Sequence, residues 1–146
     1  MKIGILIVFR NDERVIDTQK FTKLLTKKNK LNVCFVNNGS TDKTLELLKE
    51  IQEETPVPIS ISIIDVKKNR GHHAAIKAGV RYLTSENELP YILCLKDYTS
   101  RDFEMLEKVF HIIQQGKGIV KGLFKKTKRM IHKNVFSLRG ILDTAC

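Results

Sequence analysis

The amino-acid sequence predicts an α/β protein with a doubly wound, mostly parallel sheet that carries helices on both faces. Short apolar runs alternate with longer amphipathic segments along the chain, a pattern typical of strands joined by helical crossovers. The first run, residues 3–9, is apolar apart from one glycine, as expected of a strand buried on both faces. The run at 33–36 leads directly into the polar, turn-forming residues 37–44 and then into an amphipathic segment.

Five strands are expected along the chain, at residues 3–9, 32–36, 59–63, 91–95 and 119–124. Most of these segments are mainly apolar, as interior strands of a parallel sheet are. The third differs, because Ile59, Ile61 and Ile63 alternate with serines. We therefore expect this strand to be less buried and to lie nearer the edge of the sheet.

Four helices are expected between the strands, at residues 14–28, 41–53 and 72–83 and from Ser100 or Asp102 to about Gln115. The second has N-cap candidates in Ser40, Thr41 and Asp42, and two prolines, at positions 56 and 58, follow its end. The third is rich in alanine and glycine, so that it can pack closely on the sheet.

Charge and cysteine content limit the class of protein. The formal net charge is +10, of which +7 lies in residues 117–146, and this favours anionic partners such as phosphates, acidic lipid headgroups or nucleic acid. Cys34, Cys94 and Cys146 have no metal-site spacing, and the first two lie in apolar runs, as reduced core cysteines of a cytoplasmic protein would. No run of about 20 apolar residues is present, so a membrane span is not expected.

Four segments in order resemble one family: residues 9–13, 36–44, 69–79 and 91–97. Together they are similar to the nucleotide-sugar-binding half of family 2 glycosyltransferases, which are inverting enzymes with an A-type fold. The resemblance covers residues 1–122, and each segment alone is weak. It implies a site at the carboxyl edge of the sheet, where open α/β folds bind ligands.

The resemblance implies a role for each matching position. Val8, Phe9 and Arg10 at the end of the first strand would hold the base and ribose, and Asn38 would contact the base. The loop after the third strand would bring its backbone near the nucleotide, with Arg70 as a diphosphate contact. The residues implied for the nucleotide sugar are Phe9, Arg10, Asn38, Asn69, Arg70, Gly71, Lys96 and Asp97.

Two of the family's motifs are altered. The usual Asp-Asp at the end of the second strand is Asn37-Asn38, which leaves the base preference open because an amide both donates and accepts. The Asp-x-Asp that binds the divalent metal is replaced by Lys96-Asp97-Tyr98. Asp97 is then the one carboxylate left to hold Mg²⁺ or Mn²⁺, and the alternative is that the Lys96 ammonium replaces the metal's charge against the diphosphate. No other cofactor is expected.

The family's general base lies in its acceptor-binding half, and after Lys117 this chain has only one carboxylate, Asp143. No catalytic residue is assigned. One hypothesis is a glycosyltransferase-like protein that binds a nucleotide-diphosphate sugar and transfers it with inversion in polysaccharide or glycoconjugate assembly, with a second copy or a partner protein supplying the acceptor half. The alternative is an inactive binding or scaffold domain that docks a partner protein or a membrane through its tail.

The tail, residues 123–146, is expected to be a basic amphipathic helix from about Lys125, after a nucleotide-sugar-binding domain at 1–122. Its apolar stripe would consist of Val120, Phe124, Ile131, Val135, Leu138 and Leu142. The stripe could pack on the domain or a second subunit, or lie on an anionic membrane at the periphery of the cytoplasm. Nucleic acid is disfavoured, since Phe124 and Phe136 are the only aromatic residues there.

Overall fold

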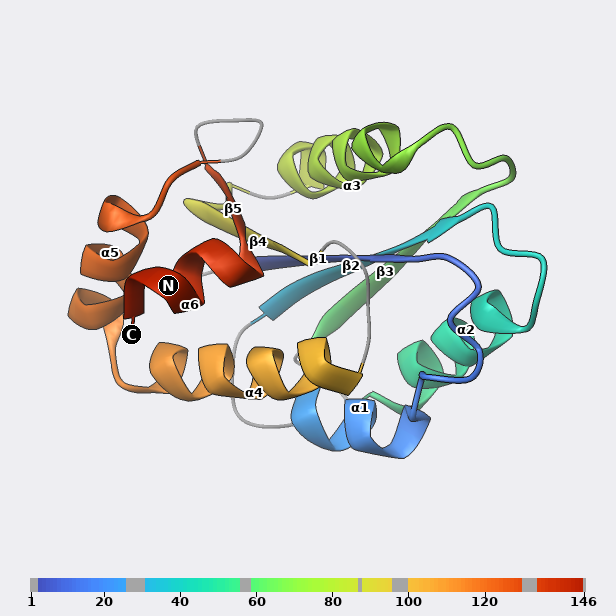
Figure 1. Ribbon diagram of the computed structural model, residues 1–146, viewed down its shortest axis with the longest axis horizontal. Coiled ribbons are helices and arrows are strands. Elements are labelled where there is room, and N and C mark those ends of the chain that lie inside the picture. The colour runs from blue at the N-terminus through green and yellow to red at the C-terminus, as the bar shows by residue number, and fades with distance from the viewer. Residues whose placement is uncertain are drawn as a thin grey trace.

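Among the residues that the computed structural model describes, five parallel strands form one sheet (Figure 1). The structure describes residues 3–25, 31–55, 59–86, 88–95, 100–129 and 134–145. The strands are β1 (Ile3–Phe9), β2 (Leu31–Asn38), β3 (Ser60–Val66), β4 (Tyr91–Leu95) and β5 (Val135–Ser137). Their order in the sheet is β3-β2-β1-β4-β5, and every neighbouring pair is parallel. The predicted α/β fold with a parallel sheet is confirmed.

Helices cover both faces of this sheet. They are α1 (Thr18–Leu25), α2 (Thr44–Glu54), α3 (His72–Glu86), α4 (Ser100–Gln114), α5 (Lys117–Lys126) and α6 (Leu138–Ala145). Figure 1 shows α3 on one face and α1, α2 and α4 on the other. The buried residues of α5 and α6 belong to the same core cluster as those of α1 and α4. None of the helices in the described ranges is both long and apolar enough to cross a membrane.

The alternating side chains of β1 explain why the run at 3–9 is apolar throughout. Ile5, Ile7 and Phe9 join the core under α1, α2 and α4, whereas Leu6 and Val8 join a second core under α3. Every residue of β1 is buried. Because successive residues of a strand point to opposite faces, a strand covered on both sides needs apolar residues at every position.

The prediction for the third strand is confirmed. β3 lies at the edge of the sheet, and none of its residues is fully buried. Its outer edge has no neighbouring strand in the described part of the chain. The alternation of isoleucine and serine therefore matches a strand with only one partner.

The strand predicted at residues 119–124 is wrong, because this segment lies in α5. Val120 and Phe124 are four positions apart and both are buried. Ile119, just before Val120, and Lys121, just after it, are exposed. A spacing of four places residues on one helix face, but in six residues it is easily mistaken for a strand. The fifth strand is instead the three-residue β5, which pairs with β4.

The single tail helix predicted from about Lys125 is also wrong, because a helix ends at Lys126 and a strand and another helix follow. Val135 pairs with Ile92, so that part of the expected apolar stripe lies in the sheet. Ile131 lies outside the described residues. The division of the chain at residue 122 stays a prediction.

The two core cysteines should be inert in the folded protein. Cys34 and Cys94 are 0% and 2% exposed, and burial raises the pKa of each thiol to about 12. At pH 8 the reactive thiolate is then only about one part in 10⁴. A Cys146→Ser variant should therefore show no thiol that reacts with Ellman's reagent until denaturant is added, when two should appear. Rapid reaction without denaturant would contradict this burial.

Candidate functional site

The loops that follow β1, β2 and β3 gather at one edge of the sheet, on the right of Figure 1. This is the carboxyl edge, because all strands are parallel and the ends of β1 and β2 are in register, with Phe9 opposite Asn37. On the other side of β1 lies β4, so the chain reverses its direction of winding between these two strands. Such a switch point is where the loops of neighbouring strands diverge and leave room for a ligand.

Two asparagines from different loops meet at this edge. The Nδ2 group of Asn38 donates to Oδ1 of Asn69 at 3.2 Å, and the backbone N–H of Gly71 donates to the same oxygen at 2.9 Å. Asn38 is 3% exposed, and its own Oδ1 is buried without a hydrogen-bond partner among the residues that the structure describes. A buried carbonyl without a donor costs free energy, so this oxygen is suited to accept from a bound molecule.

Gly39 allows the two loops to approach each other. Its φ is +65°, and its N–H donates to the carbonyl of Val66 at 2.8 Å. A Cβ at this position would lie 2.5 Å from the backbone nitrogen of Asn69. Only glycine combines this conformation with so close a backbone contact.

Asn37 does not belong to the same side of the site as Asn38. Its Nδ2 donates to Oδ1 of Asp65 at 3.0 Å, on the neighbouring strand. The hydrogen bond from Lys67, followed by that from Asn37, holds the pKa of Asp65 below its usual value. The two asparagines that stand together in the sequence thus point to opposite faces, as strand geometry requires.

The β1–α1 and β2–α2 loops are held together by hydrogen bonds in both directions. The N–H of Asn11 donates to Oγ of Ser40 at 3.1 Å, and the N–H of Thr41 donates to Oδ1 of Asn11 at 2.8 Å. The N–H of Asp12 donates to Oγ1 of Thr44 at 2.9 Å. Asn11 has a φ of +52°, which asparagine tolerates better than most residues. Sequence reasoning missed this pairing because nothing local indicates which loop Asn11 contacts.

The N-cap predicted at Ser40, Thr41 or Asp42 is wrong, although Asp42 still stabilises the start of α2. Lys43 is the N-cap of α2, but the carboxylate of Asp42 accepts from the N–H of Thr44 at 3.0 Å and from the N–H of Glu13 at 3.2 Å. Burial acts to raise the pKa of Asp42, yet the hydrogen bond from the hydroxyl of Thr44, followed by those from the two N–H groups, outweighs it and holds the pKa below its usual value. The charged form of Asp42 therefore secures both the start of α2 and the neighbouring loop.

The predicted site residues divide by what they can offer a ligand. Phe9 is fully buried, with its ring 5.3 Å from that of Phe35, so only its backbone can face a ligand. Arg10 and Arg70 are exposed at the carboxyl edge, and Gly71 is exposed with a φ of +96°. Lys96 and Asp97 lie outside the described residues, and their roles stay predictions.

The described ranges contain no cluster of three or more histidine, cysteine, aspartate or glutamate side chains that could hold a metal ion. Asp97, the one metal ligand that the sequence offers, follows β4 and is not among those ranges. The described donor set does not by itself fit a divalent cation, which prefers several oxygen ligands.

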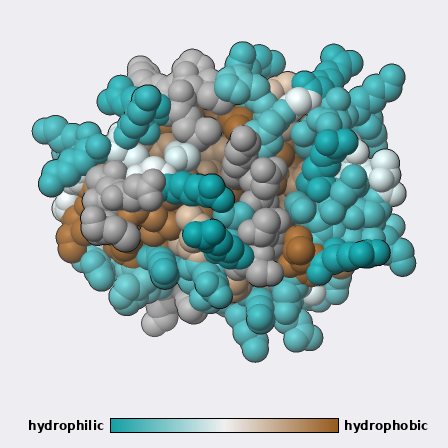
Figure 2. Space-filling model, viewed as in Figure 1, coloured by the Kyte–Doolittle hydropathy of each residue, from teal (hydrophilic) through white to brown (hydrophobic). Residues whose placement is uncertain are grey.

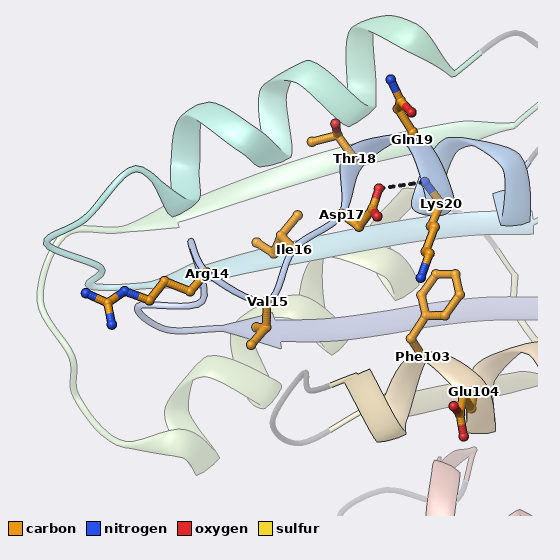
Figure 3. A pocket seen from close by; sticks show the side chains of 9 residues that line it. All are labelled: Arg14, Val15, Ile16, Asp17, Thr18, Gln19, Lys20, Phe103 and Glu104. Carbon is orange, nitrogen blue, oxygen red and sulfur yellow. Dashed lines mark hydrogen bonds between the residues drawn. The ribbon is translucent and has the colours of Figure 1, made fainter.

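A cavity of about 600 Å³ lies near this edge, between the β1–α1 loop, the start of α1 and the first turns of α4 (Figure 3). Its lining residues are Arg14, Val15, Ile16, Asp17, Thr18, Gln19, Lys20, Phe103 and Glu104. In Figure 3 the carboxylate of Asp17 accepts from the N–H of Lys20, which caps the first turn of α1. None of these residues comes from the β2–α2 or β3–α3 loop, so the cavity is separate from the contact between Asn38 and Asn69.

About three quarters of the chain is similar in sequence to parts of two longer bacterial proteins. The chain is 32% identical over 111 residues to the uncharacterized glycosyltransferase YkcC of Bacillus subtilis, covering 74% of this chain and 33% of that protein. It is 26% identical over 113 residues to the poly-beta-1,6-N-acetyl-D-glucosamine synthase of Staphylococcus aureus strain COL, covering 75% of this chain and 26% of that protein. The chain thus matches about a third or less of the length of these relatives.

The fold has a solved counterpart. The crystal structure of S. aureus TarS 1-349 superposes with a TM-score of 0.52 and 18% identity, over 92% of this chain and 43% of that one, which supports the fold alone. The family model described as Glycosyl transferase family 2 matches residues 5–141, and this range includes β5 and reaches into α6. With nearly the whole length matched, the chain belongs to glycosyl transferase family 2.

Proposed function

We propose that the carboxyl edge binds a nucleotide-diphosphate sugar and that the chain is the donor-binding part of a transferase in polysaccharide or glycoconjugate assembly. Family membership supports a sugar donor and an acceptor in general terms. The observation that carries the proposal for this chain is the buried Asn38, whose Oδ1 faces no donor within the described residues. A nucleobase with an N–H group would supply that donor.

The surrounding residues suit the rest of such a ligand. The backbone at Phe9 and Arg10 ends β1 beside Asn38, where a base and ribose would lie. The exposed guanidinium groups of Arg10 and Arg70 can each bind a phosphate through two parallel hydrogen bonds. Asp97 is the ligand proposed for a divalent metal, and Lys96 is the proposed fixed charge that would act where no metal binds.

A second candidate function is binding without sugar transfer. It is favoured by the sequence at the metal motif, where Lys96 and Tyr98 stand in place of carboxylates. Loss of two of these oxygen ligands would weaken a metal site strongly. The two candidates share the donor site and differ in turnover.

Calorimetric titration with UDP, GDP and their sugars, with and without Mn²⁺, tests the donor site. We expect binding to at least one nucleotide series, and we expect Asn38→Ala to weaken it about 5- to 100-fold, since a buried hydrogen bond is lost. Asn32→Ala is the matched control, because Asn32 lies at the opposite end of the same strand and should have no effect.

Each outcome of this titration has a consequence. Absence of binding at millimolar ligand would contradict the donor site itself. Equal loss in both asparagine variants would contradict the role of Asn38. Binding that Mn²⁺ strengthens would support Asp97 as a ligand, whereas binding without metal would support Lys96 as the compensating charge. Slow release of free sugar from the bound donor would favour a transferase over a domain that only binds.

A further inference from the structure

We propose that the outward face of α5 docks on an anionic lipid bilayer. This α5 surface is defined by exposed residues of the helix and by two exposed cations that follow its end: Ile119, Lys121, Lys125 and Lys126 in α5, then Lys128 and Arg129. The proposal does not rest on nucleotide binding, because it concerns a different end of the molecule.

The first observation is the exposure of Ile119. It is 53% exposed, more than Val15 and Tyr82 at 39% each, which are the other large apolar side chains exposed among the described residues. Leu123 lies one turn further along the same side of the helix and is partly buried. Figure 2 shows a hydrophobic patch at the left edge, over the part of the molecule that Figure 1 assigns to α5 and α6. A single exposed isoleucine is common on protein surfaces and does not by itself indicate a binding surface, so the proposal also depends on the charges around it.

The second observation is the one-sided charge. Between Glu107 and Asp143 the sequence has no aspartate or glutamate and contains nine Lys and Arg residues, beginning with Lys108. The five cations of the α5 surface are exposed and form no ion pair with residues that the structure describes. Lys126 lies seven positions after Ile119 and therefore on the same side of the helix. An apolar side chain among unpaired lysines is complementary to acidic headgroups over an acyl layer.

The third observation favours a lipid bilayer over nucleic acid as the partner of the α5 surface. Single strands are bound by stacking bases on exposed aromatic rings. In this region Phe124 is 2% exposed and its ring is stacked on Tyr91 at 4.4 Å, while Phe136 is 3% exposed. Neither ring can stack on a base. Gly118 and Gly122 stand on the outward side, where an added Cβ would meet nothing within 4 Å, so the backbone itself can approach a flat surface closely.

This mode of binding would orient the molecule. In Figure 1, α5 lies at one end of the longest axis, and the β1–α1, β2–α2 and β3–α3 loops lie at the other end. A helix of ten residues is about 15 Å long and would lie in the headgroup region without crossing it. The carboxyl edge of the sheet would then face the water, open to a soluble ligand.

Sedimentation with lipid vesicles tests the proposal. We expect the full chain to bind vesicles of phosphatidylcholine mixed with phosphatidylglycerol and to remain unbound with phosphatidylcholine alone. Lys125→Gln with Lys126→Gln should weaken binding about 30-fold, roughly fivefold for each charge. Ile119→Ser should weaken it about 10-fold. These side chains are exposed, and circular dichroism would confirm that each variant is folded.

Matched controls make the result specific. Lys49→Gln with Lys77→Gln removes the same charge from α2 and α3, and Val15→Ser removes an exposed apolar side chain elsewhere, so neither should change vesicle binding. Equal losses in the controls, equal binding to neutral vesicles, or no binding to acidic vesicles would each overturn the proposal. Binding to an oligonucleotide but not to acidic vesicles would assign the α5 surface to nucleic acid instead.

Discussion

Replacing Gly39 with alanine is expected to lower the free energy of unfolding by about 2–5 kcal/mol. A side chain at its φ of +65° costs about 1–2 kcal/mol. The new Cβ would also lie 2.5 Å from the backbone nitrogen of Asn69, and relieving such overpacking costs about 1–3 kcal/mol more. Because the obstacle is backbone, no side-chain rotation can remove it. The β3–α3 loop would have to move, and Asn69 would move away from Asn38.

Two other glycines separate the causes of this effect. Gly71 has a φ of +96° but open space around it, so Gly71→Ala should show the strain alone, about 1–2 kcal/mol. Gly118 lies in α5 with open space and an ordinary backbone, so Gly118→Ala should stabilise the protein by about 0.5–1 kcal/mol. Urea unfolding of the three variants gives the comparison. If Gly39→Ala lowers the free energy of unfolding no more than Gly71→Ala does, the result would contradict the close contact between the two loops.

Replacing Phe21 with alanine should cost about 3–5 kcal/mol, the usual range for a large buried aromatic residue. Phe21 is 0% exposed, and its ring lies 6.2 Å from Phe9, 5.7 Å from Phe35 and 5.9 Å from Phe103. It therefore connects α1 to two strands and to α4. Since a domain of this size is typically stable by about 5–15 kcal/mol, the variant should lose between about a fifth and all of its stability.

Thermal unfolding followed by circular dichroism measures this loss. Phe21→Leu should retain more of the stability, because it leaves a smaller cavity. Tyr82→Ala is the control for removing an aromatic ring from a helix surface, since Tyr82 is 39% exposed and its hydroxyl is 3.2 Å from Ser62. We expect the control to cost about 1 kcal/mol. A similar cost for Phe21→Ala and Tyr82→Ala would mean that α1 is not held through this aromatic cluster.

The elements that could be predicted from sequence are those with strong local patterns. β1 and β4 have the predicted bounds, and α3 begins at the predicted His72, because continuous apolar runs and a polar loop before a small-residue helix leave few alternatives. The segment 119–124 could not be assigned correctly. Its six residues fit either a helix face or a strand, and the choice depended on Val120 and Phe124 packing into a core formed by distant parts of the chain.

The polar residues at the strand ends could be located from sequence, because all parallel strands of one sheet end at the same edge. The way these residues contact one another could not be predicted from the sequence. Asn38 and Asn69 are separated by 31 positions, and their contact depends on the pairing of β2 with β3 and on a glycine that lets two backbones approach. Likewise, Asn37 points away from Asn38, and the ring of Phe9 lies in the core. Hydrophobic periodicity and turn-forming residues are local properties that can be read from the sequence. The strand register, the face to which each side chain points and the contact between loops are set only when the strands pair and the helices pack on the sheet.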